Sequence, residues 1–316
     1  MLHKQLVKGS ALSISILLFS FLFIGCIDMN AQQDPQFTQY MYNTVAINPA
    51  YAGSRGMLSI FGIHRAQWIG LEGAPTTTGT SIHTPLNDSR IGLGVSMLQD
   101  AIGPSNKQTL SADFSYTIST SENYKLSFGL KGTASLFSID YTKLNRFDIN
   151  DPRFQNNISN QFSPNIGAGL YLHSKQFYAG ISVPFMLQSN EFNDINSQVT
   201  HESLHYYFMS GYVFEISEST KFKPAFLAKA VEGAPLQVDL SANFMLNNKF
   251  VLGGAWRWEA AMSGLAGFQV NDNWFIGYTY DADSTKLANY NSGSHELFMR
   301  YEFIGKKEKI VSPRFF

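Results

Sequence analysis

The chain has 316 residues, a formal net charge of −1 at pH 7, 14% aromatic residues and only 15% charged residues. A charge this close to zero gives no reason to expect nucleic-acid binding. The aromatic-rich and charge-poor composition is unusual for a soluble domain and is expected of a strand wall that faces lipid.

Residues 1–31 are predicted to be a cleavable signal peptide. Lys4 and Lys8 supply a positive start, an apolar stretch follows over residues 11–25, and cleavage is expected after Ala31. A second interpretation is a lipoprotein signal in which Cys26, the single cysteine, is the lipidated residue. If cleavage follows Ala31, the mature chain has no cysteine, and disulfides or thiolate metal sites are excluded.

Residues 32–56 are predicted to be a plug or a periplasmic segment. Apolar and small side chains recur there at the spacing of one helix face, which predicts a helix over 36–47 that Asn48-Pro49 ends. Such a stripe needs a surface to lie against, so we expect it to pack inside the barrel or across its periplasmic mouth. The alternative is a peptide that waits for a partner. The stripe is Phe37, Tyr40, Met41, Thr44 and Val45, and the candidate plug or partner contacts are Phe37, Tyr40, Met41, Asn48, Pro49 and Tyr51.

Residues 57–304 read as about fourteen strand-length segments whose connections alternate between short and long. Tight turns at one end and longer loops at the other are typical of an outer-membrane barrel. The predicted fold is therefore all-β, a transmembrane antiparallel up-and-down β-barrel with a short N-terminal helical or plug segment, and residues 305–316 form a periplasmic tail. The short connections lie at 87–88, 121–123, 174–175, 218–220, 247–248 and 271–273, and the long ones near 70–75, 100–107, 141–160, 189–203, 231–235, 259–262 and 281–292.

Strict alternation of apolar and polar residues over 109–118, 236–246 and 296–303 predicts which face of each strand meets lipid. Leu240 and Phe244 are expected to face lipid. Residues 57–69 carry apolar side chains at both the odd and the even positions, so we do not assign which face of this strand meets lipid. Polar residues expected in the lumen are Asp113, Lys131, Asp239, Asn243, Arg300 and Glu302.

Many aromatic residues lie near the ends of the predicted strands, where they suit the interfacial girdles of a membrane barrel. Ordinary strand-forming aromatics are the alternative. The residues are Trp68, Tyr124, Tyr171, Phe177, Tyr206, Tyr207, Trp256, Trp258, Trp274 and Tyr280.

Three polar clusters raise the question of chemistry. The motif His201-Glu202-Ser203-Leu204-His205 matches a zinc pattern that requires a helix, but here it opens a strand, so no zinc site is expected. His295-Glu296 is interpreted as a rim pair with Glu296 inward, and Asp281 with Asp283 lacks a full calcium ligand set. We expect no catalytic residue, cofactor or metal.

Several blocks resemble the PorP/SprF family of type IX secretion system membrane proteins from Bacteroidetes-type bacteria. The most specific blocks are residues 33–43 and Asn48-Pro49-Ala50-Tyr51-Ala52-Gly53-Ser54, and weaker matches follow in order along the chain. Those are His205-Tyr206-Tyr207 to Gly211-Tyr212, Lys223-Pro224, residues 232–239, residues 277–281 and residues 292–297.

The resemblance implies a non-enzymatic outer-membrane barrel, surrounded by membrane lipids, that serves protein secretion. Its implied partners are other secretion components and a large surface-protein cargo such as a gliding adhesin, with no small-molecule substrate. Fourteen strands leave a lumen that side chains alone do not fill, so a channel for small or hydrophobic solutes stays open as an alternative. A barrel-embedded hydrolase is the third hypothesis.

Overall fold

The computed structural model describes the barrel and the segment before it. The predicted signal peptide, the predicted tail and His201 lie outside the described residues. The described residues are 37–38, 40–86, 90–144, 151, 154, 156–187, 204–232 and 234–304.

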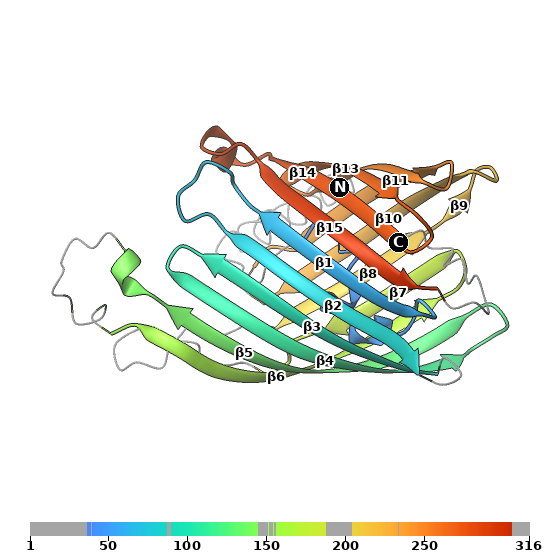
Figure 1. Ribbon diagram of the computed structural model, residues 1–316, viewed down its shortest axis with the longest axis horizontal. Coiled ribbons are helices and arrows are strands. Elements are labelled where there is room, and N and C mark those ends of the chain that lie inside the picture. Colours follow the sequence, from blue (N-terminus) through green and yellow to red (C-terminus); the bar gives the residue numbers. More distant parts are fainter. Residues whose placement is uncertain are drawn as a thin grey trace, which may run out of the picture.

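The described chain forms one closed antiparallel β-barrel in which each strand pairs with its neighbours in sequence. The first strand, β1, pairs with both β2 and the last strand, β15, and this pairing closes the wall (Figure 1). β8 and β9 pair with the same neighbour, β10, on either side of Val213, so they are two parts of one strand. The prediction of a barrel of fourteen strands is confirmed.

The strands are β1 (Leu58–Ala66), β2 (Thr76–Leu86), β3 (Ile91–Ile102), β4 (Ser105–Ser119), β5 (Lys125–Ile139), β6 (Ile158–His173), β7 (Phe177–Val183), β8 (His205–Tyr212), β9 (Phe214–Glu215), β10 (Thr220–Val231), β11 (Gln237–Leu246), β12 (Phe250–Arg257), β13 (Ala261–Gln269), β14 (Trp274–Asp283) and β15 (Ser294–Phe303). Short helical turns, η3 (Tyr141–Lys143) and η5 (Lys286–Asn289), lie in two of the long connections. Among the described residues, no helix is long and apolar enough to cross a membrane.

The two ends of the barrel differ in their connections. The short-turn end holds tight hairpins such as the three-residue connection 247–249, where Asn247 and Asn248 have positive φ angles of 53° and 51° and the Lys249 N–H donates to the Leu246 carbonyl at 3.0 Å. The long-loop end was predicted less well, because Gly103-Pro104 alone joins β3 to β4 where a loop over 100–107 was expected. Residues 105–108 are polar but belong to β4, since the ladder with β3 continues to the pair Ile102 and Ser105. Likewise, residues 258–260 are a tight connection.

The burial pattern confirms the predicted faces. Leu240 and Phe244 are 43% and 42% exposed on the outer surface, and the polar residues between them point inward. The alternation arises because successive side chains of a strand point to opposite faces, and only the outer face must be apolar. All the residues predicted in the lumen are buried there: Asp113, Lys131, Asp239, Asn243, Arg300 and Glu302.

An aromatic core inside the barrel explains the segment whose faces could not be assigned. In β1, Phe61 and Ile63 point inward, and Phe61 stacks on Phe298 with ring centroids 5.9 Å apart. Tyr171 and Tyr207, predicted for the interfacial girdles, also point inward and are only 2% and 7% exposed. The prediction was wrong for these two tyrosines because a packed chain segment lies in the lumen, and both tyrosines belong to one apolar core with it.

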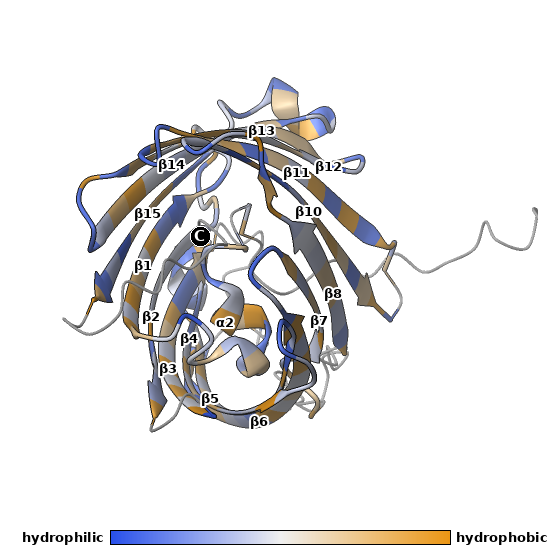
Figure 2. Ribbon diagram, turned by 90° about the vertical axis from the view of Figure 1, so that its right-hand side faces the viewer, coloured by the Kyte–Doolittle hydropathy of each residue, from blue (hydrophilic) through white to orange (hydrophobic). Residues whose placement is uncertain are grey.

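That segment is residues 37–56, which lie within the ring of strands on the side of β4, β5 and β6 (Figure 2). We call it the plug segment. It contains α2 (Thr44–Ile47) and η1 (Pro49–Tyr51), so the helix is shorter than the predicted 36–47. Tyr42 and Asn43 are buried as fully as the predicted stripe. A single apolar face therefore does not describe the segment, since the wall surrounds it.

Candidate functional site

The plug segment runs along the lumen from one end of the barrel to the other. Thr38 lies at the long-loop end, where its hydroxyl donates to Asp281 at 2.6 Å and its backbone N–H donates to Glu296 at 3.2 Å. Gly53 lies at the short-turn end, where its N–H donates to His83 Nδ1 at 3.2 Å. The segment therefore occupies the length of the barrel and does not only cover its mouth.

The outer anchor of the plug segment is a buried ionic cluster at the long-loop end. Arg65 on β1 contacts Asp281 at 2.7 Å and Glu296 at 3.0 Å. One guanidinium thus lies between two carboxylates, and the side chains of all three residues are almost completely shielded from solvent. Thr38 donates to both carboxylates and so supplies part of the hydrogen bonding that buried charges require.

The inner anchor uses Arg55, the only charged residue of the plug segment. Its Nε pairs with Glu302 on β15, and its Nη1 donates to the Tyr51 hydroxyl at 3.4 Å. Glu302 and the Tyr51 hydroxyl thus provide partners that a buried guanidinium requires. Arg300 lies 3.5 Å from the same Glu302 carboxylate, which therefore balances two cations.

Between the anchors, the plug segment packs directly against glycine residues of the wall. Gly92, Gly129 and Gly169 lie on three different strands, β3, β5 and β6. A Cβ at Gly92 would overlap the Ala52 carbonyl, and one at Gly129 would overlap Ala50. At Gly169 a Cβ would meet the side chain of Asn48. Gly92 and Gly129 let two backbones approach each other closely, and Gly169 makes room for the Asn48 side chain, which only a residue without a Cβ permits.

The wall also satisfies the carbonyl groups that a very short helix leaves without partners. Lys131 Nζ donates to the Val45 carbonyl at 3.3 Å and also pairs with Asp113 at 3.0 Å. Ser182 donates to the Ile47 carbonyl at 2.7 Å. In return, the Asn48 side-chain amide donates to the Leu170 carbonyl at 3.0 Å.

The structure places all six candidate contact residues in the lumen. Tyr40, Met41, Asn48, Pro49 and Tyr51 are buried, and Phe37 is partly buried against the same apolar core. Asn48 is completely buried, and its side-chain oxygen also accepts from the Ala50 N–H at 3.0 Å, which starts η1.

Sequence reasoning missed several residues of this site. Tyr42 packs on Phe275 and Phe298 with ring centroids 5.4 and 4.5 Å apart, although it falls outside the helical stripe. A single arginine in an otherwise uncharged segment was an available signal for Arg55. The glycines of the wall carried no such signal, since the close approach exists only in three dimensions.

Two of the polar clusters that raised the question of chemistry meet in one ion-pair network, since Asp281 and Glu296 both contact Arg65. Among the residues that the structure describes, no three His, Cys, Asp or Glu side chains form a group that could hold a metal. His205 of the zinc-like motif is buried on the inner face of β8. Asp281 pairs with Arg65 and accepts a hydrogen bond from Thr38. Glu296 points inward, whereas His295 contacts the Tyr278 hydroxyl at the outer surface.

An apolar outer surface on a closed strand wall, together with a charged and packed interior, defines an outer-membrane β-barrel protein. A family model described as type IX secretion system membrane protein PorP/SprF matches residues 29–301. The chain belongs to this family. No curated protein matches it.

Solved structures of barrels resemble the fold at low sequence identity. The CymD monoaromatic hydrocarbon channel is 12% identical, with 85% of this chain and 94% of that chain covered and a TM-score of 0.50. The outer membrane protein Omp33 of Acinetobacter baumannii is 9% identical, with 78% and 98% covered and a TM-score of 0.45. At 12% identity the likeness to the CymD channel shows the fold alone.

Proposed function

We propose that this protein is a non-enzymatic component of the type IX secretion system that supports export or surface attachment of a large cargo, such as a gliding adhesin, through protein–protein contacts. It reaches the outer membrane by means of a signal peptide over residues 1–31. Its partners are other secretion components and the secreted cargo. The observation that carries the proposal, beyond family membership, is the plug segment that fills the lumen lengthwise.

The plug segment argues against the alternative of a solute channel. Both of its ends are tied to the wall by buried charges, and its middle touches glycine backbone on three strands. A gate that leaves the lumen would have to break the buried Arg55–Glu302 pair and the hydrogen bonds from Thr38 to Asp281 and Glu296, which costs several kcal/mol. The similarity to a hydrocarbon channel concerns the fold alone and adds no support for transport.

The buried polar groups also favour a structural function over catalysis. Arg55, Arg65 and Lys131 each pair with a carboxylate and hold the plug segment or the wall in place. A catalytic group would need access to a substrate, whereas these groups are enclosed by packed chain.

The proposal is tested by deleting residues 33–48 from the chromosomal gene. We expect the shortened barrel to reach the outer membrane, as judged by heat-modifiable migration, and export of surface protein to fall strongly. Substitution of Asn248 by Ala, in a turn far from the plug segment, is the control. Normal export by the shortened barrel would refute the proposal.

Planar-bilayer recording tests the alternative directly. The intact protein should show no steady conductance, whereas the form without residues 33–48 should conduct because the lumen is then unfilled. A steady conductance of the intact protein would favour a channel.

A further inference from the structure

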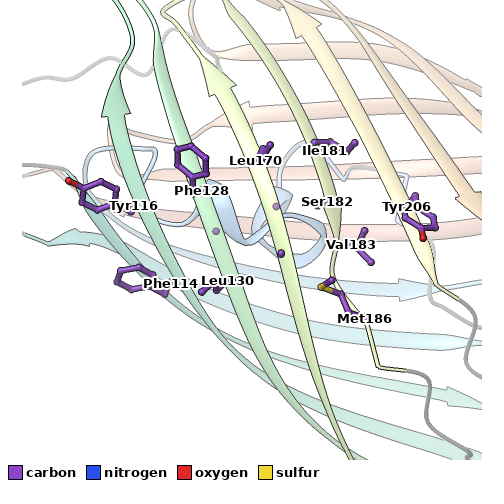
Figure 3. A pocket seen from close by; sticks show the side chains of 13 residues that line it. Phe114, Tyr116, Phe128, Leu130, Leu170, Ile181, Ser182, Val183, Met186 and Tyr206 are labelled. Carbon is purple, nitrogen blue, oxygen red and sulfur yellow. The ribbon is translucent and has the colours of Figure 1, made fainter.

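The outer surface of the barrel has an apolar groove of about 560 Å³ across β4, β5, β6, β7 and the start of β8 (Figure 3). Its sides are outward-pointing aromatic and aliphatic side chains, most of them exposed on the lipid-facing surface. The principal ones are Phe114, Phe128, Leu130, Leu170, Ile181 and Tyr206.

The groove exists because its floor has only small residues. Gly129, Ala168 and Gly169 lie side by side there, since Gly129 is opposite Gly169 and Leu130 is opposite Ala168 in the β5–β6 ladder. β7 ends early, and Ala168 is opposite its last residue, Val183. Met186 then adds its side chain to the rim, and its N–H donates to the Ile166 carbonyl at 2.8 Å.

We propose that this groove is a specific binding site for one acyl chain of an outer-membrane lipid. It lies among side chains that face the hydrocarbon region, so hydrocarbon is the medium that reaches it. An extended peptide would bring backbone N–H and C=O groups into a site without polar partners, which the hydrocarbon region does not tolerate. A flexible acyl chain fits the space and buries apolar surface on both sides.

The site lies directly behind the plug segment. Gly129 and Gly169 form the groove floor on the outside and meet Ala50 and Asn48 on the inside. Leu170 and Ser182 line the groove and also hydrogen-bond to the plug segment. In Figure 3 the pale blue plug segment is visible behind these strands. A chain in the groove and the plug segment are therefore separated by a single layer of backbone.

Native mass spectrometry of the full-length protein, extracted from outer membranes in a mild detergent, tests this site. We expect one phospholipid or lipid A molecule to stay bound to the folded barrel. Ala168→Phe and Val183→Trp fill the groove and should each reduce the lipid-bound fraction at least fivefold. Ala242→Phe places the same bulk on the lipid face of β11, away from the groove, and should retain the lipid.

Heat-modifiable migration shows that each variant is folded, and all three changes add apolar bulk to a lipid-facing surface, where it is tolerated. Equal lipid retention by the wild type and both groove variants would overturn the proposal. Retention of a free hydrophobic compound in place of a membrane lipid would overturn it as well.

Discussion

Arg55 and Glu302 join the plug segment to the last strand of the barrel, across 247 positions of the chain. Glu302 also faces Arg300, so one carboxylate compensates two buried guanidinium groups. The cluster is asymmetric, since loss of the carboxylate leaves two cations together, whereas loss of Arg55 leaves one pair intact.

This asymmetry predicts that a change at Glu302 destabilises the barrel more than a change at Arg55. Glu302→Gln should destabilise the folded barrel by about 3–5 kcal/mol, the usual cost of breaking a buried pair. Arg55→Met should cost less, because Arg300 remains beside Glu302. Urea unfolding of the barrel in lipid vesicles measures both changes, and the reverse order would contradict the assignment of the shared carboxylate.

Gly129→Val is expected to disturb the plug segment. Its Cβ would enter the space of Pro49 and Ala50, whose backbone cannot move away easily, so overpacking should cost about 1–3 kcal/mol or displace the segment. Gly132→Val is the matched control on the same strand, since nothing lies within 4 Å of a Cβ there. Limited proteolysis between residues 40 and 52 detects displacement. Equal protease resistance of both variants would count against close packing at Gly129.

Leu240→Arg should hinder insertion by about 2–4 kcal/mol, because this side chain faces lipid. Gln237→Arg, on the inner face of the same strand beside Asp239, should cost much less. Asn243, although also inward, is a poor comparison because it packs against Met41 of the plug segment. Folding into lipid vesicles measures the difference, and similar yields for the two variants would reverse the assigned faces.

The protein should bind no stoichiometric zinc. His205 is buried on the inner face of a strand, whereas the zinc motif requires both histidines on one face of a helix. Calorimetric titration of the purified barrel with zinc checks this. Tight binding that a His201→Ala, His205→Ala double variant abolishes would show that the motif is a real site.

The strand pattern was predictable because lipid imposes one rule on every strand. Leu110 and Ser111 alternate for the same reason as Leu240 and Ser241, and each strand can be interpreted alone. The rule failed in β1, where Phe61 points inward, since an aromatic core in the lumen removes the contrast between the two faces.

The depth of the plug segment was not predictable in the same way. The residues that hold Arg55, Thr38 and Asn48 are distant in sequence, and no local pattern marks them. The tight hairpin at Gly103-Pro104 was hidden for another reason. Strand residues that extend beyond the lipid at the rim contact water, and they can be as polar as a loop.

The enclosed position of residues 37–56 has a consequence for biogenesis. The wall closes only when β15 pairs with β1, and the plug segment, which precedes β1, cannot cross the finished seam. It therefore enters the lumen either before the seam forms or through the short-turn end where β1 begins. In both cases its contacts with Glu296 and Glu302 form only after β15, the last strand to be synthesised, is in place.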